Sequence, residues 1–444
     1  MSYPTDTYIS IRAGTPTPRL VYALDITLGT LLGLQWVFSD NPDPAAIPLA
    51  YGVPARPGEF ALYDCGLLRE QGIRPDPPAV DTEGAFPRLF PAPPGFGVSY
   101  DVLAAVFYLV TEYELYTTYH SDTHDRYDLS AYPSVAWGLD DQPLAHRWAA
   151  ELWTALTAHT GPQKRPLRAP RSAAGCVTID VDFPWKYLHK GIFSMAGLAA
   201  DLARGQFVQL WERLRALITG IDPNDTFNLL TTVCPPDKTL FFFLIERHSP
   251  HDSRFTWRHR PYRALIRSLR DQGYRLGIHP SYTTFLAPAK IAAERQALGE
   301  MTCLAVRDSR QHFLRYRLPD TLHHLLAAGI RADFTPCRVQ SGGFPAGMAV
   351  PYYWFDLLAD TPSPLLRWPA MIMDRTLQQY MQLSPAEALA RMQTLLATTC
   401  EVGGVFTLLL HNDSLSESGE WQGWRPAIRE MIRLTTALPA PTFI

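Results

Sequence analysis

The sequence lacks the features that mark several classes of protein. Its 444 residues include six widely spaced cysteines and no Cys-x-x-Cys pair, so a disulfide scaffold is not indicated. Apolar runs such as "VLAAVFYLV" at 102–110 are far shorter than the roughly 18 residues of a membrane span. A Gly-x-Ser-x-Gly motif is also missing, which disfavours a serine esterase.

The chain has little net charge as well. Its 40 Lys and Arg residues against 43 Asp and Glu residues give a formal net charge of -3. This balance does not point to nucleic acid or an anionic membrane as partner, and a neutral, small or carbohydrate ligand fits better. Asp25 interrupts the one segment that resembles a signal sequence, 19–36, and no cleavage-like site follows it. We expect a core helix there and a cytoplasmic protein whose protein partners are unknown.

A proline-rich cationic stretch, "GPQKRPLRAPRSAA" at 161–174, divides the chain. Prolines that block helix formation, without apolar periodicity, are typical of an exposed linker. Phosphate binding by its basic residues is the alternative interpretation. We therefore predict an N-terminal domain at 1–170 and a second domain at 171–444.

The second part alternates apolar runs with segments of helix-forming residues. The runs are "CVTIDV", "TLFFFLI", "YRLGIH", "CLAV", "IRADFT", "LRWPAMIM" and "GVFTLLLH". Nearly continuous apolar runs are typical of parallel strands that helices cover on both faces, and about 250 residues suit a (β/α) barrel. The first part is predicted to be a smaller mixed α/β domain, with strands in "PLAYGV" and "FALYDCGLL" and a helix over "SYDVLAAVFYLVTEYELYTTY".

Polar residues follow these runs at their C-terminal ends, where barrel enzymes place their active sites. They are Asp180, Asp182, Glu246, His248, His279, Arg310, Gln311, His312, Asp333, His411, Asn412 and Asp413. Each alone could cap a turn or helix, but together they indicate a site.

The paired acids at the end of "GCVTIDVD" suggest metal chemistry. Strand alternation places Asp180 and Asp182 on one face, where their repulsion is relieved if one binds a cation and the other takes a proton from water. His279 and His411 add an imidazole ligand and a proton donor.

Five motifs, in order, resemble those of the polysaccharide deacetylases, also called carbohydrate esterase family four or NodB-homology proteins. They are "TIDVD", "GIHPSY", "SRQHFLRYRLPDT", "GGFPAGMAVPYYWFDL" and "GGVFTLLLHND". The resemblance runs from about residue 175 to the C-terminus and is closest to a two-domain subgroup common in Bacteroidetes. The segment "YDVLAAVFYLVTEYELY" resembles a helix of the companion domain in that subgroup.

The resemblance implies a distorted (β/α) barrel that removes acetyl groups from N- or O-acetylated sugars with zinc or a similar divalent ion. It implies that Asp180 is the general base, Arg310 orients that base and His411 is the general acid. Asp182 and His279 would bind the metal. For an acetylated oligo- or polysaccharide substrate we expect contacts from Trp185, Tyr282 and Trp354.

Two positions depart from the family pattern. Thr283 stands where a second metal-binding His is typical, so we expect His312 or water to complete the metal shell. Pro345 replaces a cationic residue that could pair with a site carboxylate. These departures motivate a second hypothesis, a glycan-binding or scaffolding module that keeps the fold without turnover.

Other motifs receive simpler interpretations. "HSDTHDRYD" places His120, Asp122 and His124 at alternate positions, but it matches no zinc signature and a solvated loop is favoured. "SGGFPAG" is expected to be a turn, because no nucleotide-binding signature follows it. Trp354 and its aromatic neighbours could stack on a sugar or pack between loop and sheet.

Overall fold

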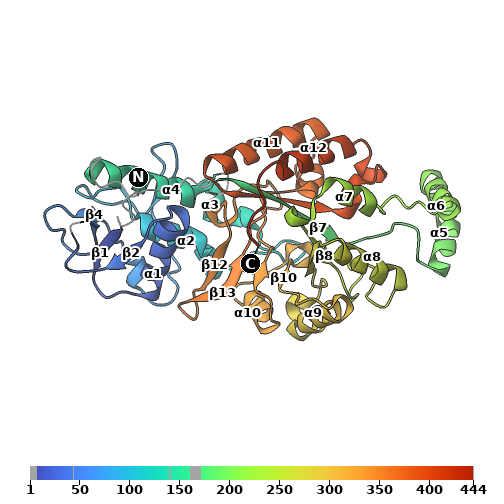
Figure 1. Ribbon diagram of the computed structural model, residues 1–444, viewed down its shortest axis with the longest axis horizontal. Coiled ribbons are helices and arrows are strands. Elements are labelled where there is room, and N and C mark those ends of the chain that lie inside the picture. The colour runs from blue at the N-terminus through green and yellow to red at the C-terminus, as the bar shows by residue number, and fades with distance from the viewer. Residues whose placement is uncertain (1–7, 44, 140–141, 161–171, 444) are drawn as a thin grey trace, which may run out of the picture.

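The computed structural model describes residues 8–43, 45–139, 142–160 and 172–443. The molecule is elongated, with the N-terminal part at one end and a large sheet flanked by helices in the remainder (Figure 1). The predicted linker at 161–174 and the boundary near residue 170 fall largely outside the described residues. The division into domains at 170 therefore stays a prediction.

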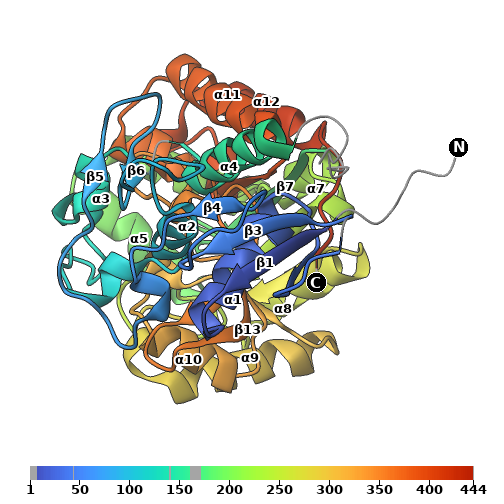
Figure 2. The same ribbon diagram turned by 90° about the vertical axis from the view of Figure 1, so that its left-hand side faces the viewer.

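The N-terminal part is built on a parallel sheet with the order β2-β1-β3-β4. Its strands are β1 (Ile9–Ala13), β2 (Trp36–Phe38), β3 (Ile47–Tyr51) and β4 (Phe60–Leu62). Figure 2 looks onto this end, where β1, β3 and β4 lie side by side. A small antiparallel pair is formed by β5 (Val80–Asp81) and β6 (Arg88–Leu89). The strands predicted in "PLAYGV" and "FALYDCGLL" are thus confirmed as β3 and β4.

Helices complete this part. They are α1 (Pro18–Leu24), continued by a π-helical segment at Asp25–Leu31, then α2 (Val102–Val110), α3 (Pro133–Ala136) and α4 (Leu144–Thr160). The helix expected at 19–36 is confirmed as far as Leu31, while Trp36 begins β2. The helix predicted over 99–119 is longer than the observed helix α2, Val102–Val110. Helix α2 ends at Val110 because Glu112 adopts a left-handed backbone with φ 52°, and a 3-10 turn follows.

Within the described residues, the second part contains a nine-stranded sheet in the order β12-β13-β11-β10-β9-β8-β7-β15-β14. Every pairing is parallel except that of β12 with β13. Its strands are β7 (Ala174–Val181), β8 (Thr239–Phe243), β9 (Arg275–Ile278), β10 (Asp308–Ser309), β11 (Ala332–Asp333), β12 (Tyr352–Asp356), β13 (Thr361–Arg367), β14 (Ile372–Met373) and β15 (Val405–His411).

Most predicted strands are confirmed, but "CLAV" is not one. Cys303 ends a helix in the left-handed conformation with φ 58°, Leu304 is exposed, and the strand begins only at Asp308. The sequence also gave no sign of the antiparallel pairing of β12 with β13. A single bridge between Cys337 and Ala370 links the chain after β11 to the chain before β14. Among the described residues, no strand pairing closes the sheet into a barrel.

Helices flank the sheet on both sides. They are α5 (Ile192–Ala203), α6 (Phe207–Thr219), α7 (Phe227–Val233), α8 (Arg260–Asp271), α9 (Pro288–Thr302), α10 (Asp320–Ala327), α11 (Pro385–Glu401) and α12 (Arg425–Thr436). In Figure 1, α11 and α12 lie above the sheet and α9 and α10 below it, while α5 and α6 project from one end. Helix α11 begins with a capping box between Ser384 and Glu387. None of the described helices is long and apolar enough to span a membrane.

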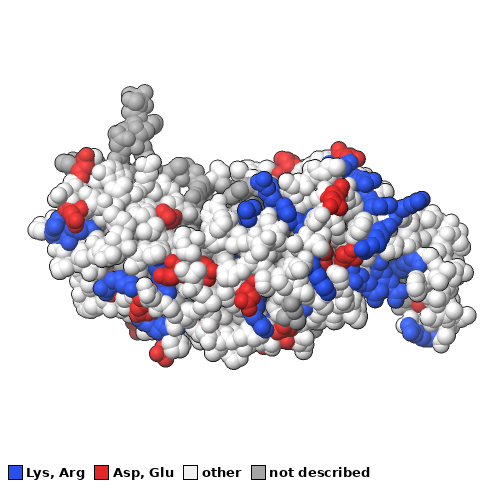
Figure 3. Space-filling view, turned by 90° about the horizontal axis from the view of Figure 1, so that it is seen from below, with Lys and Arg blue, Asp and Glu red and all other residues white. Residues whose placement is uncertain are grey.

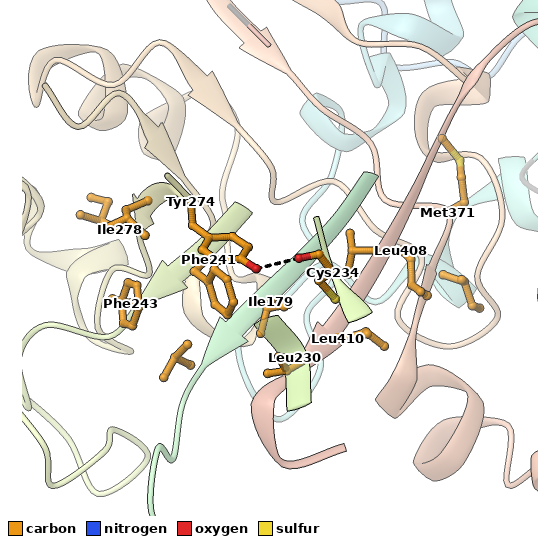
Figure 4. Close-up of a cluster of buried hydrophobic side chains, with 14 of the residues drawn as sticks. Ile179, Leu230, Cys234, Phe241, Phe243, Tyr274, Ile278, Met371, Leu408 and Leu410 are labelled. Carbon is orange, nitrogen blue, oxygen red and sulfur yellow. Dashed lines mark hydrogen bonds between the residues drawn. The ribbon is translucent and has the colours of Figure 1, made fainter. Parts of the chain in front are cut away.

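The parallel strands β7, β8, β9 and β15 are buried on both faces, as their apolar sequences predict. Ile179, Phe241 and Leu408 belong to the main core, where Tyr274 donates a hydrogen bond of 2.7 Å to the Cys234 carbonyl (Figure 4). Phe242, the neighbour of Phe241, packs in a separate cluster on the opposite face. Alternation along each strand supplies both layers of the core.

A buried arginine joins the two parts of the molecule. The Arg367 guanidinium lies 2.9 Å from the Asp333 carboxylate and 3.0 Å from the carboxylate of Glu112, which follows α2. Arg367 and Asp333 are fully buried. Apolar residues of the second part, including Met348 and Phe355, pack into the N-terminal core beside this group.

Asp333→Ala should leave the buried Arg367 charge with incomplete compensation and lower the free energy of unfolding by about 3–5 kcal/mol. Chemical denaturation measures the loss. The control is Arg433→Ala, whose partner Glu430 and own side chain are exposed, and it should leave the unfolding midpoint unchanged. An Asp333 variant as stable as wild type would contradict the importance of this ion pair.

Asp101 offers a stability test as a function of pH. It caps α2 and accepts hydrogen bonds from the Tyr51 hydroxyl and the Cys65 backbone at 3.0 and 2.9 Å. Burial outweighs these bonds and raises the pKa of Asp101 from 3.8 to about 6. A carboxyl whose pKa is higher in the folded state contributes stability that is present below pH 3.8 and lost as the pH rises through 6.

The size of this effect is about 3 kcal/mol, from a shift of about two pKa units. Asp101→Asn should remove the corresponding fall in stability between pH 4 and 6, which urea denaturation at a series of pH values measures. If the variant and the wild type show parallel stability curves over this range, Asp101 is not the titrating group.

Candidate active site

The carboxyl ends of β7, β9, β10 and β15 bring five of the predicted site residues, Asp180, Asp182, His279, His312 and His411, to one cavity of about 540 Å³. The pairing of β7 with β15 places Asp180 directly beside His411. The pairing of β9 with β10 places Ile278 beside Ser309, so the residues that follow them, His279 and Arg310, are neighbours as well. The cavity is lined by Arg126, Asp180, Asp182, Phe183, Pro250, His251, His279, His312, Phe313, Leu314, Met373, Arg375, Gln379, Tyr380, His411, Asp413 and Glu420. Adjacent parallel strands end at one edge of a sheet, which explains the convergence.

Asp180 is held by a fully buried arginine. Arg310 donates from Nη1 to the Asp180 carboxylate at 2.8 Å and from Nη2 to the Thr178 hydroxyl at 2.7 Å. Its Nε donates to the Phe334 carbonyl at 3.0 Å, and the guanidinium lies over the ring of Phe242. These contacts fix the guanidinium, and with it the orientation of the Asp180 carboxylate.

Asp182, His279 and His312 form a group whose candidate ligand atoms all lie within 4.8 Å of one another. His279 Nδ1 lies 2.6 Å from the Arg310 carbonyl, which can only accept, so Nδ1 carries the proton and Nε2 has a free lone pair. His312 Nδ1 lies 3.2 Å from the Asp252 carboxylate, and its Nε2 lies 3.7 Å from the Asp182 carboxylate. Such second partners are typical of metal-binding histidines.

Two buried atoms of this group have no hydrogen-bond partner, Asp182 Oδ1 and His312 Nε2. Buried polar atoms are rarely left unsatisfied, and a cation bound between them would satisfy both. Burial raises the pKa of Asp182, but His312 and His279 outweigh it and hold that pKa well below its ordinary value. Burial lowers the pKa of His312, yet Asp182 and Asp252 raise it to about 9, so a bound cation would displace the proton on its Nε2. The residues present therefore fit a divalent cation.

His411 is oriented by an acid that the sequence analysis missed. Asp374 accepts from the backbone N–H of His411 at 2.7 Å and lies 2.8 Å from its Nδ1. His411 Nε2 then lies on the cavity side, 3.7 Å from Asp182 Oδ2. Burial lowers the pKa of His411, but Asp374 outweighs it and raises the pKa to about 9. Asp374 follows β14 directly, so the strand-end pattern could have identified it.

Two of the predicted substrate contacts lie elsewhere. Trp185 is 5% exposed, donates from its indole nitrogen to Asp225 at 3.1 Å and packs in the core. Trp354 is 3% exposed and donates to the Tyr116 hydroxyl at 3.1 Å. Neither lines the cavity, because their rings fill space between elements. Phe183, which is 44% exposed, lines it instead.

Tyr282 lies behind the cavity wall. Its ring packs on Phe313, a lining residue, and the Arg315 guanidinium lies 3.9 Å from its centre. The Tyr282 hydroxyl is 3.3 Å from His124 Nδ1 in the "HSDTHDRYD" loop. The sequence favoured a solvated loop here, yet the structure packs it against the second part.

The same loop places an N-terminal residue at the cavity. Arg126 lines the cavity, pairs with Asp122 at 2.6 Å and donates to the Tyr380 hydroxyl at 3.2 Å. The N-terminal part thus shapes the site, a task that the sequence could not assign to it.

Of the remaining residues that follow the strands, some line the cavity and others do not. Asp413 lines the cavity and pairs with Arg375 at 2.8 Å. Asp333 belongs to the buried Arg367 group, while Glu246 binds Arg258 at 2.6 Å, away from the lining residues. Further residues that follow the strands, Gln311, Asn412 and His248, do not line the cavity.

The departures from the family pattern have structural counterparts. The third member of the candidate metal group is His312, whereas the resemblance led us to expect a histidine at position 283, where this chain has Thr283. Pro345 is buried and does not line the cavity. A cationic side chain nevertheless lines the cavity. It is Arg375, which pairs with Asp413 at 2.8 Å and with Glu420 at 2.9 Å.

Comparisons with known proteins cover both parts of the chain. The profile of a family described as "Family of unknown function (DUF7033)" matches residues 9–161. No curated protein matches the sequence.

Solved structures give distant similarities. The chain is similar to a protein named as a polysaccharide deacetylase from Mycobacterium smegmatis, with 19% identity, a TM-score of 0.39 and coverage of 61% of this chain and 86% of that one. It is similar to Puue allantoinase at 12% identity, TM-score 0.37 and coverage of 62% and 90%. For a protein named as a polysaccharide deacetylase from Pseudomonas aeruginosa PAO1, identity is 10%, TM-score 0.39 and coverage 62% and 91%.

His312→Ala should weaken divalent-cation binding by more than about 100-fold, because it removes a ligand outright. Asp252→Asn should weaken it by about 10–100-fold, since it only releases the His312 ring. Isothermal titration with zinc and manganese measures both effects. The control His323→Ala removes a half-exposed histidine outside the cavity and should have no effect. Equal affinities in all four proteins would exclude this group as a metal site.

Proposed function

We propose that the protein is a metal-dependent hydrolase that removes acetyl groups from N- or O-acetylated carbohydrate. The observation that carries the proposal is the meeting, in one cavity, of a carboxylate fixed by Arg310, an Asp-His-His group with unsatisfied ligand atoms and a histidine oriented by Asp374. These are a base, a metal site and an acid. We also propose that the sheet is a distorted, incompletely closed (β/α) barrel.

The ligand group favours zinc among the divalent ions. Catalytic zinc sites commonly use two histidines and one carboxylate and keep a position open for water. When bound, a divalent cation supplies a Lewis acid for the acetyl carbonyl and lowers the pKa of a water molecule to about 7. Asp182, His279 and His312 would hold it.

The chain's own residues would divide the proton transfers. Asp180 takes a proton from the attacking water as oxygen bonds to the acetyl carbon, and Arg310 keeps its carboxylate aligned. His411 donates its proton to the departing sugar nitrogen or oxygen as the bond to the acetyl carbon breaks. The products are acetate and the free amine or hydroxyl. Asp374 keeps His411 in the protonated form that this step needs.

The cavity wall suits a sugar-sized substrate. A volume of about 540 Å³ is within the usual range for small-ligand sites. Phe183 and Tyr380 offer aromatic surface, while Arg126, Gln379 and Arg375 offer hydrogen-bond donors for hydroxyl groups. We propose these residues, in place of Trp185 and Trp354, as the substrate contacts.

Asp180→Asn should lower kcat by about 10²–10⁴-fold, because the amide cannot accept the proton, while cation affinity is largely retained. Acetate release from N-acetylglucosamine oligomers and O-acetylated xylan oligomers measures turnover. The control Asp237→Asn changes an exposed acid at the opposite end of β8 and should match wild type. Wild-type turnover by the Asp180 variant would remove the proposed base. Chelator-insensitive glycan binding without turnover would favour the glycan-binding module.

A further inference from the structure

Helices α5 and α6 form a hairpin, residues 192–219, inserted after β7 and projecting from one end of the molecule (Figure 1). More than half of the large hydrophobic side chains exposed in the described part of the chain lie at residues 192–221. They are Ile192, Phe193, Met195, Leu202, Phe207, Val208, Trp211, Leu217, Ile218 and Ile221. Soluble monomers rarely expose apolar side chains in such a concentration.

The hairpin buries polar or small residues and exposes apolar ones, the reverse of an ordinary surface helix pair. In α5 the buried residues are Ser194 and Asp201, and in α6 the buried residue is Ala216. Trp211 and Ile218, by contrast, are 69% and 81% exposed. A surface helix normally turns its apolar stripe toward the core. Here the apolar stripe faces outward and the polar or small residues face inward.

Spacing along the helices gathers the exposed residues into stripes. Ile192, Met195 and Leu202 follow one another at i, i+3 and i+10 on α5, and Phe207, Trp211 and Ile218 at i, i+4 and i+11 on α6. Each set therefore lies along one face of its helix.

Polar contacts hold the hairpin in this orientation. Glu212 of α6 accepts from Lys186, from the Tyr187 hydroxyl and from the Ser418 hydroxyl of the second part. Asp222 accepts from three successive backbone N–H groups at 186–188, which ties the two ends of the insertion together. The outward position of the apolar face is therefore built into the fold.

A basic pocket lies at the base of the hairpin. It is lined by His189, Lys190, Gly191, Phe193, Arg247, Arg254, Phe255 and His259, with no carboxylate among these residues. Arg254 lies over the ring of Phe193, and neither Arg247 nor Arg254 forms an ion pair among the described residues. Figure 3 shows basic side chains gathered at this end of the molecule.

We propose that the α5–α6 hairpin docks on an anionic lipid surface, its apolar face entering the acyl boundary and the basic pocket binding headgroup phosphates. Aromatic and aliphatic residues beside exposed arginines are the composition of interfacial helices. Arg215 lies between Trp211 and Ile218 on α6, where its long side chain can reach the headgroups. This docking does not depend on the chemistry proposed for the cavity.

Charge favours lipid over a second copy of the chain. A two-fold contact through the hairpin would set its own cations, including Lys190, Arg254 and Arg215, near their symmetry mates. An anionic surface neutralises the same cations, and each of them strengthens binding. The net charge of -3 concealed this local excess of positive charge.

Co-sedimentation of the whole protein with vesicles tests the proposal. Binding to phosphatidylcholine vesicles should rise at least tenfold when phosphatidylglycerol is added, and should weaken with salt. Phe207→Ser with Trp211→Ser should reduce partitioning more than about tenfold, because both side chains lose their burial in lipid. The control Leu358→Ser changes a residue that is equally exposed, at the turn between β12 and β13, and should bind like wild type.

The basic pocket is tested separately. Arg247→Gln and Arg254→Gln should each weaken binding about fivefold, the equivalent of about 1 kcal/mol per cation. Arg429→Gln, an exposed arginine on α12, should have no effect. Circular dichroism and thermal melting confirm that each variant is folded, as expected for exposed positions.

Three results would overturn the proposal. The first is no binding to either vesicle, and the second is undiminished binding by the Phe207 and Trp211 double variant. The third is a dimer in analytical ultracentrifugation that the double variant dissociates, without vesicle binding. That last result would make a second copy of the chain the occupant of the hairpin face.

Discussion

The site depends on how the charge of two acids at the end of one buried strand is compensated. Asp180 is almost fully buried, so its carboxylate needs a fixed partner, and Arg310 provides it from the neighbourhood of β10. Asp182 has no such arginine; histidines surround it and one of its oxygens is unsatisfied. The different compensation of these two neighbouring acids supports the proposal that Asp180 is a base and Asp182 a metal ligand. His279 and His312 lie beside Asp182, and the His411–Asp374 pair completes the group of ionisable residues at the cavity.

The N-terminal part contributes to the same cavity instead of standing apart. The Glu112–Arg367–Asp333 group fixes it against the large sheet, and Arg126 then reaches the cavity wall. A buried ion group of this kind sets one relative position, because moving it would leave a charge unpaired. The cavity is therefore a product of both parts of the chain.

The hairpin follows a different constraint from the rest of the molecule. Elsewhere in the described residues most apolar residues of strands and helices enter one of the cores, whereas α5 and α6 keep polar or small residues inside and expose apolar ones. The chain on either side of the hairpin adjoins the cavity. Asn224, just after α6, donates a hydrogen bond of 3.2 Å to the carbonyl of Phe183, which lines the cavity. The inserted segment thus begins where the strand carrying both acids ends.

The sequence by itself determined the buried strands β7, β8, β9 and β15 and the residues at their ends, because continuous apolar runs have few other places to go. It also brought together Asp180, Asp182, His279 and His411, since parallel strands end at one edge. Only the tertiary structure placed Trp185 and Trp354 in packed interiors, paired His411 with Asp374, and brought Arg126 to the wall. Those outcomes depend on contacts between segments far apart in the chain, for which local pattern carries no signal.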